Sequence, residues 1–377
     1  MSKTGKIIAG VIVVVLGILA IVLANKAPTE TGSIKIGYID PLSGDAANFG
    51  SATKGGIEVA IKEINDAGGI GGHLIQMIYE DGKCNGKDAA AAAQKLISID
   101  HVKYIVGLVC SGEVLGVSPI SEQNKVFIMV QGSSPEISHA GKYIVRTWPS
   151  DLTSSQSIAQ HAVANNFKKM AVIIENTDYS TALGYAFNKA YTELGGEVLY
   201  SETYSPNTVD FRTALAKIKA LKPEAIFIDA QSGGNAARIA AQARELGITA
   251  QFYSAFLTGP EFVSSGPAVN GTYLVDLPAL NMSRTASTAF TRNYKQINGS
   301  DSPYPFVSAA SYDQIKLLAM SISKYGYNDT KAIRDFMHTI SSYDGVIGSF
   351  HFDENGDVAG ITLRIVQVVN GKVVDVQ

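Results

Sequence analysis

Residues 34–81 read IKIGYIDPLSGDAANFGSATKGGIEVAIKEINDAGGIGGHLIQMIYED. Two runs in this segment, 34–39 and 74–81, are rich in the residues typical of strands, and an amphipathic helical pattern over 50–67 lies between them. We therefore predict a βαβ unit, the building block of a parallel sheet covered by helices. The run Gly68–Gly72 follows the helix and not a strand, so it indicates a tight turn and not a dinucleotide-binding loop.

The same alternation of strands and helices continues along the chain and starts afresh near residue 169. Because a single core rarely grows beyond roughly 250–300 residues, a chain of 377 residues is expected to form two domains. We therefore predict an α/β fold of two doubly wound lobes. Further strands are predicted at 104–109, 126–131, 169–176, 197–204, 225–230 and 251–255, and further helices at 87–99, 113–122, 179–194, 210–221 and 235–246.

The C-terminal part predicts two long helices after Leu277 and then two strands, 349–353 and 361–376, joined by the turn Asp353–Asp357. The Asn-Gly pair in this turn is typical of hairpins, and its acidic residues lack the spacing of a calcium loop. The six histidines of the chain are scattered without ligand spacing. We therefore predict no metal site.

The N-terminal residues 1–25 predict an export signal or a membrane anchor. Lys3 and Lys6 precede the apolar stretch 7–24, whose 18 residues approach the roughly 20 that a membrane-spanning helix needs. A cleaved signal and an uncleaved anchor both remain open, and we favour the anchor. The lysines would then stay in the cytoplasm, and the linker 26–33 would lead to an extracytoplasmic protein in the periplasm or at the cell surface.

Charge and cysteine content narrow the choice of partners and compartment. The 31 basic and 34 acidic residues leave a formal charge of -3, so nucleic acid is not an expected partner. Cys84 and Cys110 both follow the export segment, and an oxidising compartment would permit a disulfide between them. Two separate buried thiols remain the alternative, because spacing alone does not decide.

Polar residues at strand ends are the candidate binding site, because ligands of open parallel sheets bind beyond the carboxyl ends of the strands. Ser111 opens a helix and presents a hydroxyl and free backbone N–H groups, which suit a carboxylate. Ser133 occupies a similar position in the next loop, whereas Ser134 precedes a proline and is expected only to cap a helix. In the second series Tyr179 and Gln231 follow strand ends, where ordinary surface polarity is the competing interpretation.

After residue 33 the sequence resembles the periplasmic type I solute-binding proteins of the leucine/isoleucine/valine-binding family. Each matching stretch alone is weak, but their order and spacing follow the layout of the family. The matching stretches are Ile36-Gly37, Pro41-Leu42-Ser43-Gly44, Glu63-Ile64-Asn65, Ala67-Gly68-Gly69-Ile70-Gly71-Gly72, Val109-Cys110-Ser111, Ser134-Pro135-Glu136 and Arg244-Glu245-Leu246-Gly247.

The resemblance implies two lobes joined by a three-strand hinge that closes on a ligand. The crossovers are expected near Pro149, Leu277 and Gly348. It also implies that the two cysteines are bridged, and that the protein delivers an amino acid, most often of the branched-chain type, to the permease subunits of an ABC importer. The lobes would then consist of residues 34–149 with 278–348 and of residues 150–277 with 349–377.

The resemblance also implies where the ligand lies. Members of the family hold the carboxylate and ammonium groups of an amino acid mainly from the first lobe. They use the serine after the cysteine, here Ser111. They also use the loop that corresponds to Gln131, Gly132 and Ser133. Tyr179 corresponds to a tyrosine that closes over the ligand from the second lobe.

Three positions depart from the family pattern. Phe49 stands where a tyrosine is common, Gln231 where another aromatic residue is common, and Phe256 where an acidic partner of the ammonium is expected. A buried ammonium without a carboxylate costs several kcal/mol, so either another acid substitutes or the ligand has no such group. Asp229 is the candidate substitute, because it lies two residues before Gln231 and alternate residues of a strand share a face. A solvated charge at the strand end is the alternative interpretation of Asp229. Phe49, Phe256 and Phe306 are candidate apolar walls.

The sequence does not predict an enzyme or a cofactor. It has no Gly-x-Ser-x-Gly elbow, no His-Glu-x-x-His motif and no Gly-x-x-x-x-Gly-Lys phosphate loop. A solute-binding protein for import is the function that the family resemblance implies. The alternative is a ligand-sensing receptor ectodomain, which would need a partner protein for signalling because only Met1–Lys6 would lie inside the cell.

Overall fold

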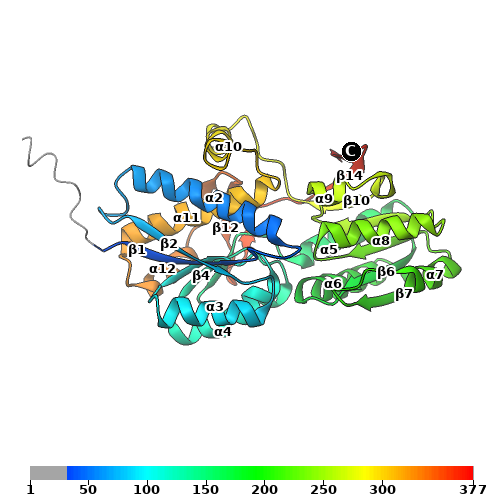
Figure 1. The fold of residues 1–377 in the computed structure, drawn as a ribbon, viewed down its shortest axis with the longest axis horizontal. Helices are drawn as coiled ribbons and strands as arrows, with labels where there is room; N and C mark the ends of the chain where they lie inside the picture. Colours follow the sequence, from blue (N-terminus) through cyan, green and yellow to red (C-terminus); the bar gives the residue numbers. More distant parts are fainter. Residues whose placement is uncertain (1–31, 377) are drawn as a thin grey trace, which may run out of the picture.

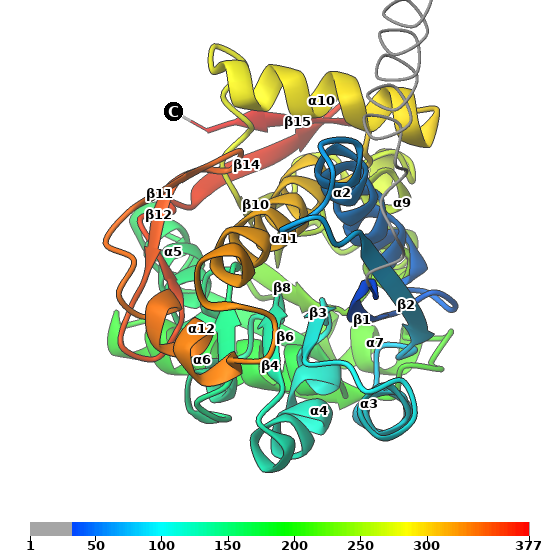
Figure 2. The ribbon, with the colours of Figure 1, turned by 90° about the vertical axis from the view of Figure 1, so that its left-hand side faces the viewer.

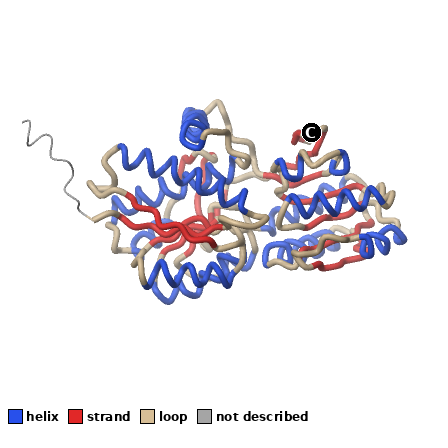
Figure 3. Tube along the Cα trace, in the orientation of Figure 1, coloured by secondary structure: helices blue, strands red, loops and turns tan. Residues whose placement is uncertain are grey.

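The computed structural model describes residues 32–376. The predicted anchor, residues 7–24, and most of the linker that follows it lie outside the described residues. Within residues 32–376, none of the helices combines the length and the apolar character that a membrane crossing requires. Each of two lobes carries its strands between layers of helices (Figure 3).

The first lobe contains β1 (Ile34–Asp40), α2 (Ala47–Asp66), β2 (Ile75–Asp81), α3 (Gly86–Ser98), β3 (Tyr104–Gly107), α4 (Ser111–Asn124), β4 (Phe127–Val130), the 3-10 helix η1 (Pro135–His139) and β5 (Ile144–Arg146), and later α10 (Thr285–Asn298), α11 (Pro305–Tyr325) and α12 (Thr330–Met337). Its five strands run in parallel in the order β2-β1-β3-β4-β5. α3 and α4 cover one face, and α2 packs against α11 on the other (Figures 1 and 2).

The second lobe contains α5 (Asp151–Ala164), β6 (Lys169–Glu175), α6 (Asp178–Glu193), β7 (Glu197–Tyr204), α7 (Arg212–Leu221), β8 (Ala225–Asp229), α8 (Gly233–Glu245), β9 (Gln251–Ala255), α9 (Pro260–Val263), the 3-10 helix η2 (Pro267–Val269), β10 (Tyr273–Asp276), β14 (Arg364–Val369) and β15 (Lys372–Asp375). The sheet order is β15-β14-β10-β9-β8-β6-β7. The strands from β6 to β10 are parallel, and β14 and β15 add an antiparallel edge.

Strand β6 explains why the sheets are covered on both faces. Val172 and Ile174 lie in the core under α5 and α6, whereas Ile173 between them lies in the core under α7 and α8. Successive side chains of a strand point to opposite faces, so a continuous apolar run fills two cores. The α/β fold with parallel sheets was therefore predictable from such runs.

The return of the chain to the second sheet comes later than predicted. The sequence placed the third crossover near Gly348, but β12 (Gly348–Phe352) pairs with β11 (Tyr343–Gly345) and β13 (Val358–Ala359), and β14 is the first strand to join the second sheet. Residue Asp357 instead bridges to Arg146 of the first lobe. The strand pattern of 349–353 was sound, but composition does not tell which sheet a hairpin joins.

Several short strands were absent from the sequence prediction, among them β5 and β10. These two have 3 and 4 residues, too few for a recognisable alternation. Both precede predicted crossovers.

A disulfide joins Cys84 to Cys110, with the two Cα atoms 5.3 Å apart. Cys84 lies before α3, and Cys110 caps the start of α4. The bond therefore ties the beginnings of two neighbouring helices together at the carboxyl edge of the first sheet.

Replacing both cysteines by serine is expected to lower the free energy of unfolding by about 3 kcal/mol, because a cross-link over 26 residues restricts the unfolded chain. Urea unfolding of the variant and of the parent protein measures the difference. Reduction of the parent protein should reproduce it. An unchanged midpoint in both experiments would show that the bond contributes no stability.

Candidate ligand-binding site

A pocket lies between the lobes, beyond the carboxyl ends of strands from both sheets. The cavity that its walls surround has a volume of about 50 Å³. Residues that follow β3 and β4 form one wall, and residues that follow β6, β8 and β9 form the other. Of the residues predicted from the sequence, those that line the pocket are Phe49, Ser111, Gln131, Ser133, Tyr179, Gln231 and Phe256.

Ser111 joins the two loops of the first lobe that face the pocket. Its Oγ accepts hydrogen bonds from the backbone N–H groups of Ser133 and Ser134, at 3.2 and 3.1 Å. Because these bonds use the lone pairs of the hydroxyl, its own hydrogen is left to donate. Ser111 is also the first residue of α4, whose first N–H groups have no carbonyl partner within the helix. This corner of the pocket therefore suits an anion.

Two buried carboxyl groups hold the loop after β3 from beneath. Asp40 accepts from the N–H of Val109 at 2.6 Å, and Glu113 accepts from the N–H of Cys84 at 3.0 Å. Burial raises the pKa of Asp40 to about 7 and raises the pKa of Glu113 well above its ordinary value. Neither lines the pocket, so both serve to position the loop.

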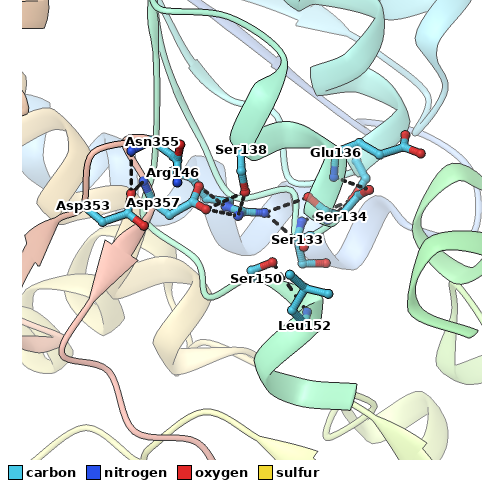
Figure 4. A network of polar contacts seen from close by, with 11 residues as sticks. Ser133, Ser134, Glu136, Ser138, Arg146, Ser150, Leu152, Asp353, Asn355 and Asp357 are labelled. Atoms are coloured by element: carbon cyan, nitrogen blue, oxygen red, sulfur yellow. Dashed lines mark hydrogen bonds and ion pairs between the residues drawn. The ribbon is translucent and has the colours of Figure 1, made fainter. Parts of the chain in front are cut away.

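Arg146 holds the loop after β4 from behind. Its fully buried side chain donates to the carbonyl oxygens of Ser133 and Ser134, at 3.0 and 2.8 Å. It also forms an ion pair with Asp357 at 2.6 Å and donates to the Oγ of Ser138 at 3.0 Å (Figure 4). The pocket wall is thereby anchored to β5 and to the hairpin of β12 and β13. Ser134 itself caps η1, as predicted, by accepting from the N–H of Glu136.

Gln131 brings an open acceptor to the pocket. Its Nε2 donates to the carbonyl oxygen of Val307 at 3.1 Å, which determines how the amide is oriented. Its Oε1 is buried and has no hydrogen-bond partner among the described residues. Leaving a buried acceptor unpaired is costly, so this oxygen is available to a donor group of a ligand.

The second lobe faces the pocket with Tyr179 and Gln231. Tyr179 lies in the first turn of α6, which Thr177 caps by accepting from the N–H of Ser180 at 3.1 Å. The backbone N–H of Gln231 donates to Glu175 at 2.8 Å. Both side chains are therefore placed by the ends of β6 and β8.

Aromatic rings form the remaining walls. Trp148 meets Phe256 and Phe306 edge to face, with ring centroids 5.4 and 5.9 Å apart. Phe49 stacks on Tyr304, with centroids 4.3 Å apart. Beyond these rings lies a second cavity of about 230 Å³, which shares Phe49, Trp148 and Phe256 with the first.

Two predicted site residues, Gly132 and Asp229, do not line the pocket. Gly132 packs so closely on Ser111 that an added Cβ would lie 3.1 Å from the Cα of that serine. Asp229 ends β8 and is buried beneath α6, where an added Cβ on Gly184 would lie 3.0 Å from its Oδ2. Burial, reinforced by the charge of Asp151, raises the pKa of Asp229 well above its ordinary value.

The pocket also uses residues that the sequence analysis missed. Trp148 is the only tryptophan of the chain and stands next to the predicted crossover at Pro149, which was a usable signal. The others are small or apolar residues just after strands, which carry no chemical signal of their own. These are Val109, Cys110, Ala230, Ala255 and Leu257.

The arrangement is suited to binding. It combines hydroxyl and amide groups from both lobes with apolar and aromatic walls. Across residues 32–376, no group of three or more His, Cys, Asp or Glu side chains is placed to hold a metal ion. A small solute with a polar head and an apolar body matches this lining.

The chain is similar to known solute-binding proteins over nearly its whole length. It is 25% identical over 362 residues to the Leu/Ile/Val-binding protein homolog 3 of Brucella melitensis, covering 93% of this chain and 95% of that protein. The crystal structure of a leucine-binding protein from Thermotoga maritima, 27% identical, covers 91% of this chain and 98% of its own, with a TM-score of 0.84.

A third similar protein is a branched-chain amino acid transporter substrate-binding protein from Streptococcus pneumoniae, solved in complex with isoleucine. It is 25% identical, with a TM-score of 0.81, and covers 91% of this chain and 98% of its own. The family model described as periplasmic binding protein matches residues 33–372, which include both lobes. With two lobes of parallel sheets and a pocket between them, this chain belongs to the periplasmic binding protein family, whose members are solute-binding proteins and not enzymes.

Proposed function

We propose that the protein captures a small solute with a carboxylate group between its two lobes and delivers it to the permease subunits of an ABC importer. The observation that carries the proposal is the position of Ser111. Its hydroxyl hydrogen is left to donate, and it stands at the beginning of α4, where the first backbone N–H groups have no carbonyl partner within the helix. Together these groups match the oxygens of a carboxylate.

The names of the relatives support this class of solute. They bind leucine, isoleucine or valine, and one structure holds isoleucine. All of these are small carboxylates with an apolar body. The pocket residues proposed to contact such a solute are Phe49, Ser111, Gln131, Ser133, Tyr179, Gln231 and Phe256, with Trp148 added from the structure.

The proposal includes an extracytoplasmic location, with residues 7–24 as a membrane tether. The lobes would move about three crossovers: near Pro149, near Leu277 and, in place of Gly348, between β13 and β14. The pocket would then close as the lobes approach.

Thermal unfolding against a panel of solutes tests the proposal, because a ligand that binds the folded state raises the midpoint. The panel contains amino acids, amides, urea, short peptides, aromatic acids and sugars. We expect the midpoint to rise only with members that carry a carboxylate. A rise with sugars or urea alone, or no rise throughout, would contradict it. Copurification with permease subunits tests delivery.

A further inference from the structure

We propose that the natural ligand is an organic acid that carries no ammonium group, with a carboxylate at one end and an uncharged, apolar body. This inference rests on the proposed function, because it narrows the class of carboxylate that the same pocket takes. It arises from what lines the pocket and from where the nearby acids lie.

The polar groups of the pocket are all neutral. They are the hydroxyls of Ser111, Ser133 and Tyr179 and the amides of Gln131 and Gln231. Within residues 32–376, no Asp or Glu lines this pocket. The lining therefore supplies donors for an anion, but no charge to balance a cation.

Two acids close to the lining, Glu175 and Asp276, already have partners. Glu175 accepts hydrogen bonds from the backbone of Gln231 at 2.8 Å and from the side chain of Asn235 at 3.1 Å. Asp276, which lines the second cavity, is paired with Arg364 at 2.9 Å. An ammonium that reached either acid would have to displace these partners.

Two further acids, Asp151 and Asp229, are buried behind the lining and not in it. Asp151 begins α5 and accepts a hydrogen bond from the Oγ of Ser154 at 3.1 Å. Asp229 lies beneath α6, against Gly184. The Oδ2 of Asp151 and both carboxyl oxygens of Asp229 are buried without a hydrogen-bond partner among the described residues. Burial raises the pKa of both groups, which favours the uncharged acid over the carboxylate that an ammonium requires.

Aromatic rings from both lobes also line the pocket. Phe256 follows β9 and packs edge to face on Trp148. The face of a ring attracts a cation, but it does not satisfy three N–H donors. The Oε1 of Gln131 is one neutral acceptor, which suits a hydroxyl on the ligand as well as a water. A primary ammonium here would therefore remain underbonded.

Matched pairs of ligands test this inference by calorimetry on the purified full-length chain. The pairs are L-leucine with 4-methylpentanoate, and L-phenylalanine with 3-phenylpropanoate, which differ only in the ammonium group. We expect the ammonium-free acid of at least one pair to bind at least tenfold more tightly than its amino acid. Trimethylglycine serves as a third probe, because it has a cation without N–H donors.

Variants of two residues separate the explanations. In Phe256→Glu the preference should reverse, because the new carboxylate lies beside the ligand; in Phe256→Gln, of the same size but neutral, it should not. If Asp229 does pair with the ammonium of a ligand, L-leucine will bind the parent protein, and this binding will be lost in Asp229→Asn. Unfolding curves of each variant establish that it is folded.

The outcomes distinguish this inference from the proposed function. The inference is overturned if either amino acid binds more tightly than its ammonium-free partner. It is also overturned if trimethylglycine binds more tightly than both ammonium-free acids, or if no member of either pair binds. The proposed function survives these results if any carboxylate in the solute panel binds, and it fails if none does.

Discussion

Replacing Ser111 and Tyr179 together by alanine is expected to weaken ligand binding about a thousandfold. Ser111→Ala removes a hydrogen bond to a charged group, worth about 2 kcal/mol. Tyr179→Ala removes a large ring that covers the pocket from the second lobe, which is worth about 2 kcal/mol at the centre of an interface. Because tenfold in affinity corresponds to about 1.4 kcal/mol, the sum reaches about three decades. Calorimetry with the best solute of the panel measures the change.

The control uses the same substitutions in the same two helices, outside the pocket. Ser121 lies later in α4, where its Oγ bonds only to the carbonyl of Ser118, and Tyr185 lies later in α6 and is 73% exposed. The variant with Ser121→Ala and Tyr185→Ala should bind as the parent protein does. Undiminished affinity in the first double variant would show that the ligand binds elsewhere.

Replacing Arg146 by methionine is expected to lower the free energy of unfolding by about 3–5 kcal/mol, since it leaves a buried carboxylate without its partner. The guanidinium is fully buried, and it satisfies Asp357 and the carbonyl oxygens of Ser133 and Ser134. Methionine fills much of the same volume, so most of the effect comes from lost polar contacts. Urea unfolding gives the value.

Arg212 provides the matched surface control. It pairs with Asp210 and Glu245, and all three side chains are more than half exposed. Arg212→Met should change the free energy of unfolding by less than about 1 kcal/mol, as is usual for exposed ion pairs. If Arg146→Met costs no more than Arg212→Met, the network of Figure 4 does not hold the loop.

Much of the pocket was predictable because parallel strands bring their carboxyl ends to one edge. Ser111, Ser133, Tyr179 and Gln231 were chosen for that reason, and all four line the pocket. Asp229 was chosen on the assumption that the strand continues to Gln231, so that the two side chains would point to the same face. β8 ends at Asp229, so Gln231 no longer shares the geometry of the strand.

Other features depend on contacts between segments far apart in the sequence. Asp357 was predicted only as part of a turn, which it is, but its pairing with Arg146 joins residues 211 positions apart. Trp148 reaches the pocket because the first crossover runs alongside it. No local pattern in the sequence reports such contacts.

The disulfide has a consequence for the order of events in the life of the chain. Cys110 directly precedes Ser111, so the covalent bond to Cys84 and the hydroxyl that faces the pocket belong to one loop. In a reducing compartment the loop would keep its hydrogen bonds, among them those to Asp40 and Glu113, but lose its covalent link to Cys84. Oxidation therefore adds a covalent support to a loop that faces the pocket, and under the proposed export of the chain this support forms only outside the cytoplasm.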